Sequence, residues 1–179
     1  MHYERFEELK RSLKFDASDA ANLQELGPIL SRYQQGITDY FYEILGQNPE
    51  TAKLIAGRID ALKRTHGIWF QELFGGKYAE PYFESRWRIG MAHVRIGLSP
   101  HFVEMVMSIV RDKVLMALAK ELPDSRQLAA KYASVLKVLD LDLMVINLAY
   151  QEERLERLAR FTGMKRVLIE NVIRMPEKK

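Results

Sequence analysis

Glycine and proline divide this sequence into segments of helical length. The breaks lie at Gly27-Pro28, Gly46-Gln47-Asn48-Pro49, Gly75-Gly76, Gly97-Leu98-Ser99-Pro100 and Pro123-Asp124-Ser125. These residue types interrupt regular helices. Between the breaks, apolar residues recur every three or four positions, and no segment shows a sustained alternation of period two. We therefore expect an all-α fold of about seven or eight helices.

Several residues mark where helices begin. Asp16-Ala17-Ser18-Asp19 is typical of an N-cap region and predicts a short helix that ends at Gly27, and Pro28 suits the first turn of the next helix. Ser99-Pro100 and Asp124-Ser125 predict the starts of the last two helices. The final helix is predicted from Ser125 to Phe161 and would extend about 55 Å, which exceeds the width of a small domain.

A stripe of apolar residues follows this final helix in steps of three and four. It consists of Tyr132, Leu136, Leu139, Leu143, Ile146 and Tyr150. Such spacing suits either the core packing of one long helix or a seam between helices of two copies. After Tyr150 the pattern becomes charged, so we expect one domain over residues 1–161 and a tail or connector over residues 162–179.

Composition excludes several classes of protein. The 27 basic residues are interspersed with 24 acidic ones along the chain, a pattern that gives nucleic-acid binding little support. Because cysteine is absent, disulfides and covalent c-type haem attachment are excluded, and a cofactor has to bind noncovalently. The N-terminus lacks the apolar region of a signal peptide, and no stretch reaches the ~20 apolar residues of a membrane span. We expect a cytoplasmic protein that does not insert into membranes.

The sequence also lacks the short motifs of common enzymes. It contains no nucleophile elbow, no glycine-rich phosphate loop and no zinc-protease motif. Asp140 and Asp142 are paired acids, but residues two apart lie on different helix faces, so we expect each to face solvent or a basic neighbour. A sensor or binding domain is therefore favoured over an enzyme, and side chemistry of a redox cofactor stays open.

Two of the four histidines lie on apolar helix faces. His66 shares its face with Leu62 and Trp69, and His93 shares its face with Ile89 and Ile96, whereas His2 is terminal and His101 is expected to be exposed. Two imidazoles on successive buried helices could face each other across a flat cofactor, and imidazole is a common iron ligand in haem proteins. The alternative is that both are core histidines bonded to backbone carbonyls.

Residues 66–100 resemble the core of the protoglobin and globin-coupled sensor family. The most specific element reads His93, Arg95, Ile96, Gly97, Leu98 and Pro100, and weaker similarity covers most of residues 15–160. The resemblance implies a globin fold with an extra N-terminal helix and long C-terminal helices, and noncovalent haem b with His93 as the proximal iron ligand. It also implies a sensor of redox state or of a diatomic gas such as O2, CO or NO. The family's dimer uses the last two helices and signals to a C-terminal output module.

This sequence departs from the family pattern at two places. His66 stands where relatives commonly carry leucine, which predicts a second axial ligand and a six-coordinate iron. Phe102-Val103 stands where relatives tend to carry Trp-Tyr, which removes a phenol near His93. By the same resemblance, Tyr42 matches the distal tyrosine that donates a hydrogen bond to bound ligand; the alternative is a core tyrosine whose hydroxyl bonds to the backbone.

The predicted site combines these residues. The expected cofactor contacts are Phe41, Tyr42, His66, Trp69, Phe70, Ile89, His93 and Ile96, with His93 and His66 as metal ligands. Arg86, Arg88 and Arg95 are candidates for the haem propionates, although solvated helix faces explain them as well. A bis-histidyl electron-transfer protein and a haem-free helical interaction module remain as alternative functions.

Overall fold

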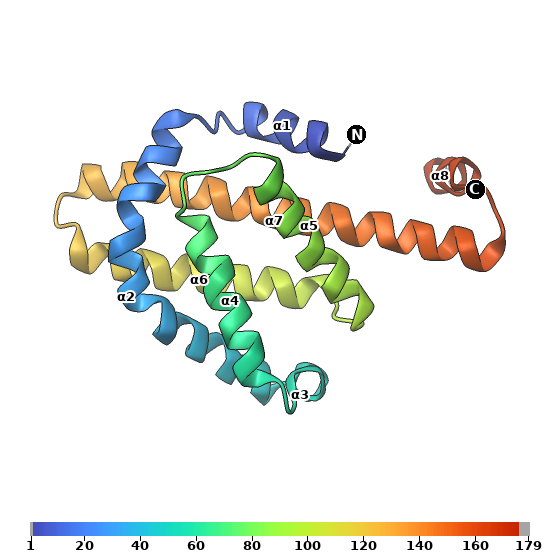
Figure 1. Cartoon of the computed structure of the whole chain (residues 1–179), viewed down its shortest axis with the longest axis horizontal. Coiled ribbons are helices and arrows are strands. Elements are labelled where there is room, and N and C mark those ends of the chain that lie inside the picture. The colour runs from blue at the N-terminus through green and yellow to red at the C-terminus, as the bar shows by residue number, and fades with distance from the viewer. Residues whose placement is uncertain (1, 176–179) are drawn as a thin grey trace.

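The structure, a computed structural model, describes residues 2–175, and Figure 1 shows their arrangement. Eight helices occur in this range: α1 His2–Ser12, α2 Ala17–Gln47, α3 Pro49–Ile55, α4 Ile59–Leu73, α5 Glu80–Arg95, α6 Pro100–Glu121, α7 Ser125–Thr162 and α8 Arg166–Arg174. No strand occurs among residues 2–175. The predicted all-α fold is confirmed.

The predicted helix starts are formed by side-chain caps and prolines. The Asp16 carboxylate accepts hydrogen bonds from the Ser18 and Asp19 amides, and the Asp19 carboxylate accepts one from the Asp16 amide, which completes a capping box at α2. Asp124 caps α7 by accepting from the Gln127 amide, and Pro100 occupies the first turn of α6. These caps satisfy amides that have no partner within a helix.

The predicted break at Gly27-Pro28 is wrong, because Pro28 lies inside α2. Proline removes one helical hydrogen bond and bends the helix, and Figure 1 shows α2 changing direction along its length. Leu26 and Leu30 are fully buried on either side of the proline, so tertiary packing keeps both halves helical. A break that we did not predict separates α3 from α4 at Gly57, whose φ of +73° favours glycine.

Helix α7 forms the centre of the core. It packs mainly against α5 and α6, and Leu139, Ile146 and Tyr150 of the predicted apolar stripe are buried within the chain. The core interpretation of that stripe is therefore correct for these residues. The crossing with α5 is close at Gly90, where an added Cβ would lie 2.6 Å from the Ala149 Cβ and 2.7 Å from the Ile146 carbonyl oxygen.

The C-terminal end of α7 extends past the other helices, and α8 lies beside this extension (Figure 1). Gly163 ends α7 in the left-handed conformation, close to the predicted end at Phe161. Arg166 of α8 pairs with Glu152 and Glu170, and Ile169 is buried. The predicted tail thus contains a helix, and its last residues, 176–179, lie outside the described range. No helix in the described part of the chain has the length and apolarity that crossing a membrane requires.

Candidate functional site

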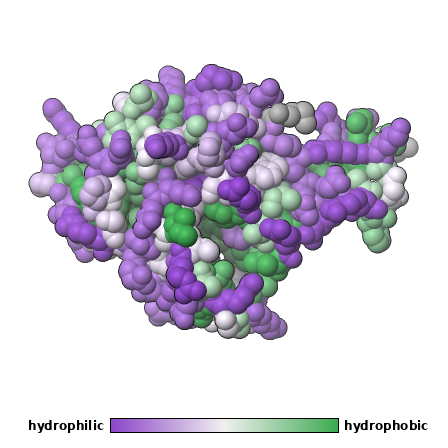
Figure 2. Space-filling model, viewed as in Figure 1, coloured by the Kyte–Doolittle hydropathy of each residue, from purple (hydrophilic) through white to green (hydrophobic). Residues whose placement is uncertain are grey.

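A cavity of about 660 Å³ lies among helices α2 to α7. Its walls are mostly apolar, and Figure 2 shows hydrophobic residues around a hollow in the face where α4 and α5 diverge. Phe41 and Leu45 come from α2, Ile89 and Ile96 from α5 and its C-terminal cap, and Val106 from α6. A volume in the range of about 300–1,000 Å³ with apolar walls is typical of small-molecule and cofactor pockets.

Both candidate ligand histidines line this cavity, His66 from α4 and His93 from α5. Burial lowers the pKa of each imidazole to about 4, so both rings are neutral near pH 7 and keep a nitrogen lone pair. Nε2 of His66 and Nδ1 of His93 are buried without a hydrogen-bond partner in residues 2–175. Buried polar atoms are normally paired, so each calls for an explanation.

If these were ordinary core histidines, as the alternative interpretation of the sequence held, their ring nitrogens would hydrogen-bond to backbone carbonyls. The only hydrogen bond of His66 within the described residues joins its Nδ1 to Thr38 Oγ1 at 2.8 Å, and His93 makes none there. Neither ring is therefore held by a backbone carbonyl, as an ordinary core histidine would be. The unpaired nitrogens instead fit a group that is bound in the cavity.

Aromatic rings surround the His66 imidazole. The ring centroids of Phe41 and Trp69 lie 4.5 Å and 4.8 Å from that of His66. Seven of the eight predicted contact residues line the cavity: Phe41, Tyr42, His66, Trp69, Ile89, His93 and Ile96. Phe70 does not line it, because this side chain is buried behind the wall, where it packs on Phe74.

Tyr42 lies on the cavity wall with its hydroxyl available. Its hydroxyl makes no hydrogen bond within the described range, so the predicted alternative of a backbone-bonded hydroxyl is not observed. Burial raises the pKa of Tyr42 to about 12, which keeps the phenol protonated near pH 7. A protonated phenol is a hydrogen-bond donor toward a small ligand.

Of the three predicted propionate arginines, two lie where an anionic group could reach them. Arg88 and Arg95 are exposed residues that line the cavity, as does Arg58, which the sequence did not single out. Arg86 is fully buried and engaged elsewhere, so it is not available to a ligand at the opening.

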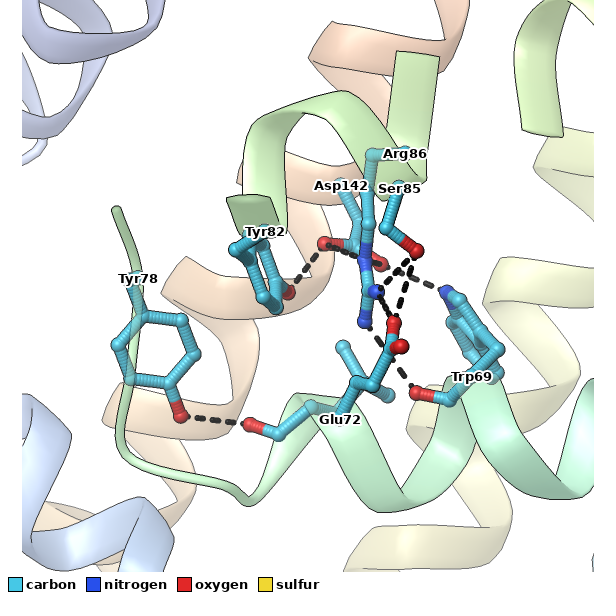
Figure 3. A network of polar contacts seen from close by, with 8 residues as sticks. Trp69, Glu72, Tyr78, Tyr82, Ser85, Arg86 and Asp142 are labelled. Carbon is cyan, nitrogen blue, oxygen red and sulfur yellow. Dashed lines mark hydrogen bonds and ion pairs between the residues drawn. The ribbon is translucent and has the colours of Figure 1, made fainter. Parts of the chain in front are cut away.

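Arg86 belongs to a buried polar network that joins α4, α5 and α7 (Figure 3). Its guanidinium pairs with Asp142, with Nε 3.0 Å from Oδ2, and also with Glu72. Trp69 Nε1 donates to Asp142 Oδ2 at 2.7 Å, and the Tyr82 hydroxyl donates to Oδ1 of the same carboxylate. All three partners of Asp142 are donors, which supports the ionised carboxylate although burial raises its pKa.

The expectation for the paired acids was that each faces solvent or a basic neighbour. Asp140 pairs with Arg111, and Asp142 pairs with Arg86 on a different side of α7, so the basic-neighbour interpretation is confirmed for both. Asp142 is completely buried, which the sequence did not indicate. His101 is exposed as predicted and bonds only to Ser99 within residues 2–175.

Residues 2–156 match the Protoglobin family. The chain belongs to the protoglobin family. Its structure resembles the globin domain of a Geobacter sulfurreducens globin-coupled sensor, with 34% identity, a TM-score of 0.77 and coverage of 80% of this chain and 96% of that one. It also shares its fold with the globin domain of E. coli DosC in a ferrous form (15% identity, TM-score 0.65, coverage 79% and 96%) and in a ferric form (14%, 0.66, 82% and 97%).

Membership of the protoglobin family implies a haem-binding globin that takes diatomic gases. The cavity of this protoglobin domain fits such a group. It has apolar walls for a porphyrin, two partly buried imidazoles that each have one buried nitrogen without a partner, and exposed arginines for carboxylates. Sequence reasoning missed Arg58, which lines the cavity, and Thr38, which only the tertiary packing of α2 and α4 brings to His66.

Proposed function

We propose that this domain is a haem-based sensor globin that binds haem b noncovalently, with His93 as the proximal iron ligand and His66 as the second axial ligand. The observation that carries the proposal is that both imidazoles line one apolar cavity and that each has a buried nitrogen without a partner. Arg88 and Arg95 line the cavity as exposed residues and would pair with the propionates, and Phe41 and Ile89 would supply apolar contacts.

When bound, haem supplies an iron that takes diatomic gases and changes oxidation state. His66 would be the residue that O2, CO or NO has to displace, and the Tyr42 hydroxyl would donate a hydrogen bond to the gas. His66 belongs to the same chain, so it competes at a high effective concentration and lowers the apparent gas affinity.

The ferric absorption spectrum tests the axial ligands. Wild-type protein is expected to be low-spin and His66→Leu high-spin, because the variant lacks the second imidazole. His101→Leu is the matched control, since His101 is exposed and does not line the cavity. A high-spin wild-type spectrum that His66→Leu leaves unchanged would contradict ligation by His66.

The contacts of Trp69 support a signal that passes from the distal side to α7. Its indole ring packs on His66 and its Nε1 donates to Asp142, which lies on α7. Movement of His66 therefore changes the surroundings of a side chain anchored on the long C-terminal helix. In this proposal, α7 carries the change toward a C-terminal output module, with residues 1–161 as the globin domain and residues 162–179 as the connector.

Trp69→Phe tests this route because it keeps an aromatic ring and removes the N–H donor. In wild-type protein, CO is expected to change amide hydrogen exchange around Asp142 on α7. The variant should bind CO and lose most of that change. An equally large change in the variant would exclude the indole as the connection.

A bis-histidyl electron-transfer protein is the second candidate, because the same pair of imidazoles also suits an iron without a vacant position. Stopped-flow mixing of the ferrous protein with CO separates the two functions. CO binding within seconds supports the sensor, whereas reversible redox cycling without CO binding supports electron transfer.

A further inference from the structure

Thr38 makes three polar contacts behind the cavity-lining His66. It lies on α2, is completely buried, and is 28 residues from His66 in sequence. Its Oγ1 is 2.8 Å from the Gln34 carbonyl oxygen and 2.8 Å from His66 Nδ1. The Gln34 side-chain Nε2 also approaches Oγ1, at 3.4 Å. Thr38 is therefore the residue of α2 that hydrogen-bonds to the His66 ring.

These contacts determine where the proton on the imidazole lies. The Thr38 hydroxyl has a single proton, and two oxygens 2.8 Å apart require it between them, so Oγ1 donates to the Gln34 carbonyl. The contact with His66 then requires Nδ1 to donate to Oγ1. A neutral imidazole has one N–H, so Nε2 of His66 carries a lone pair, and this is the nitrogen that is buried without a partner.

The packing around His66 holds the ring in this orientation. Phe41 and Trp69 contact the imidazole from α2 and α4. The next residue, Gly67, has no side chain, and a Cβ there would lie 3.0 Å from the Gln34 amide nitrogen. The glycine lets the Gln34 side chain, which also approaches Thr38, pack directly against α4.

We propose that Thr38 is a positioning residue that fixes His66 in the Nδ1–H tautomer and makes Nε2 its ligating atom. The inference rests on the proposed function, in which His66 binds iron. A hydrogen bond to the far nitrogen of a ligating histidine orients the ring and raises its basicity, and losing such a partner typically weakens metal affinity by about 10- to 100-fold. Thr38→Val keeps the shape of the side chain and removes the acceptor.

The rate of CO association with the ferrous protein measures this contribution. His66 has to leave before CO binds, so weaker ligation raises the observed rate in proportion. Thr38→Val is expected to accelerate CO association by about 10- to 100-fold and to raise the high-spin fraction of the ferric spectrum. Thr38→Ser retains a hydroxyl and should behave like wild type. Equal CO rates and spectra for Thr38→Val and wild type would overturn the inference.

His66→Leu separates this failure from failure of the proposed function. If His66→Leu leaves the wild-type CO rate and spectrum unchanged, His66 is not a ligand and the proposed function fails with it. If His66→Leu accelerates CO association and Thr38→Val does not, only the role of Thr38 is refuted.

A measurement on the wild-type chain covers the case in which Thr38→Val fails to fold. In the ferrous protein without added gas, which is low-spin and diamagnetic when both imidazoles bind the iron, the long-range 1H–15N couplings of labelled His66 identify its protonated nitrogen. A proton on Nδ1 is the expected result. A proton on Nε2 would overturn the assignment without any substitution.

Discussion

At the scale of single residues, the two candidate ligands have unequal surroundings. His66 is held by a hydrogen bond to Thr38 and by two aromatic rings, whereas neither ring nitrogen of His93 makes a hydrogen bond within residues 2–175. The nearby Tyr150 hydroxyl donates to the Leu98 carbonyl and is not free to bond to His93. In the proposed site, His66, which a gas would displace, therefore has an orienting hydrogen bond, and His93 has none.

Tyr42→Phe tests the distal donor. The substitution keeps the ring on the cavity wall and removes the hydroxyl, whose hydrogen bond to bound O2 is expected to be worth about 0.5–1.5 kcal/mol. Stopped-flow measurements should show O2 dissociation faster by roughly 2- to 10-fold. CO, a poorer acceptor, serves as the internal control and should change little. Unaltered O2 dissociation would exclude Tyr42 as the donor.

The place of His66, His93 and Tyr42 on the cavity wall could be predicted, because helical spacing points to the histidines and the family resemblance to Tyr42. Thr38 could not, since its role depends on the crossing of α2 and α4. Arg86 illustrates the same limit: its neighbours in sequence suggested a propionate partner, but its side chain turns inward to Asp142, a residue 56 positions away.

At the scale of helices, two features of α5 fix its position on α7. The Arg86–Asp142 pair is completely buried. At Gly90 the backbones of α5 and α7 lie so close together that a side chain would not fit between them. Both contacts lie on the helix that carries His93, so the position of this candidate ligand depends on them. Helix starts could be predicted from caps, but the continuity of α2 through Pro28 could not, because buried leucines on both sides maintain it.

Breaking the buried ion pair should strongly destabilise the fold. Asp142→Ala leaves the Arg86 guanidinium buried without its main counter-charge, and we expect the free energy of unfolding to fall by about 3–5 kcal/mol. The double variant Arg86→Met with Asp142→Leu should lose less, because no charge remains buried. Urea denaturation measures both, and equal losses would refute the assignment of the effect to an unpaired charge.

Two glycine substitutions test the close crossing. Gly90→Ala should lower the free energy of unfolding by about 1–3 kcal/mol, because its Cβ meets Ala149 and the Ile146 backbone. Gly36→Ala is the matched control: Gly36 also lies within a helix, but no atom lies within 4 Å of the added Cβ. Alanine is the better helix former there and should stabilise by up to about 1 kcal/mol. A higher midpoint of thermal unfolding for Gly90→Ala than for Gly36→Ala would contradict the close approach of α5 and α7 at Gly90.

At the scale of the whole molecule, apolar residues remain exposed on α6 and α7. Leu115 and Met116 of α6 are 37% and 50% exposed, and Phe161 near the end of α7 is 92% exposed. The core already buries Leu139, Ile146 and Tyr150 of the predicted stripe, so these cannot form an interface between copies. A homodimer through the last two long helices has to use other residues, and Leu115 and Met116 are the candidates on α6.

We predict that the chain is a dimer at micromolar concentration and that Leu115→Glu with Met116→Glu makes it monomeric. Glutamates at these exposed positions place like charges across the interface while leaving the core intact. Light scattering coupled to gel filtration measures the mass, and an unchanged absorption spectrum controls for the haem site. A monomeric wild-type chain would refute the dimer.

In the proposed sensor, the length of α7 would turn a small tilt near the cavity into a larger displacement at the C-terminal end of the helix. Gly90 lets α5 pack closely on this helix at Ala149, which would serve as the pivot in the proposed sensor, and the helix runs on to Thr162. From Ala149 to its last residue it extends roughly 20 Å. Over such an arm, a tilt of about 1° displaces the tip by about 0.3 Å. A change at Trp69 too slight to disturb the core would thus arrive enlarged at α8.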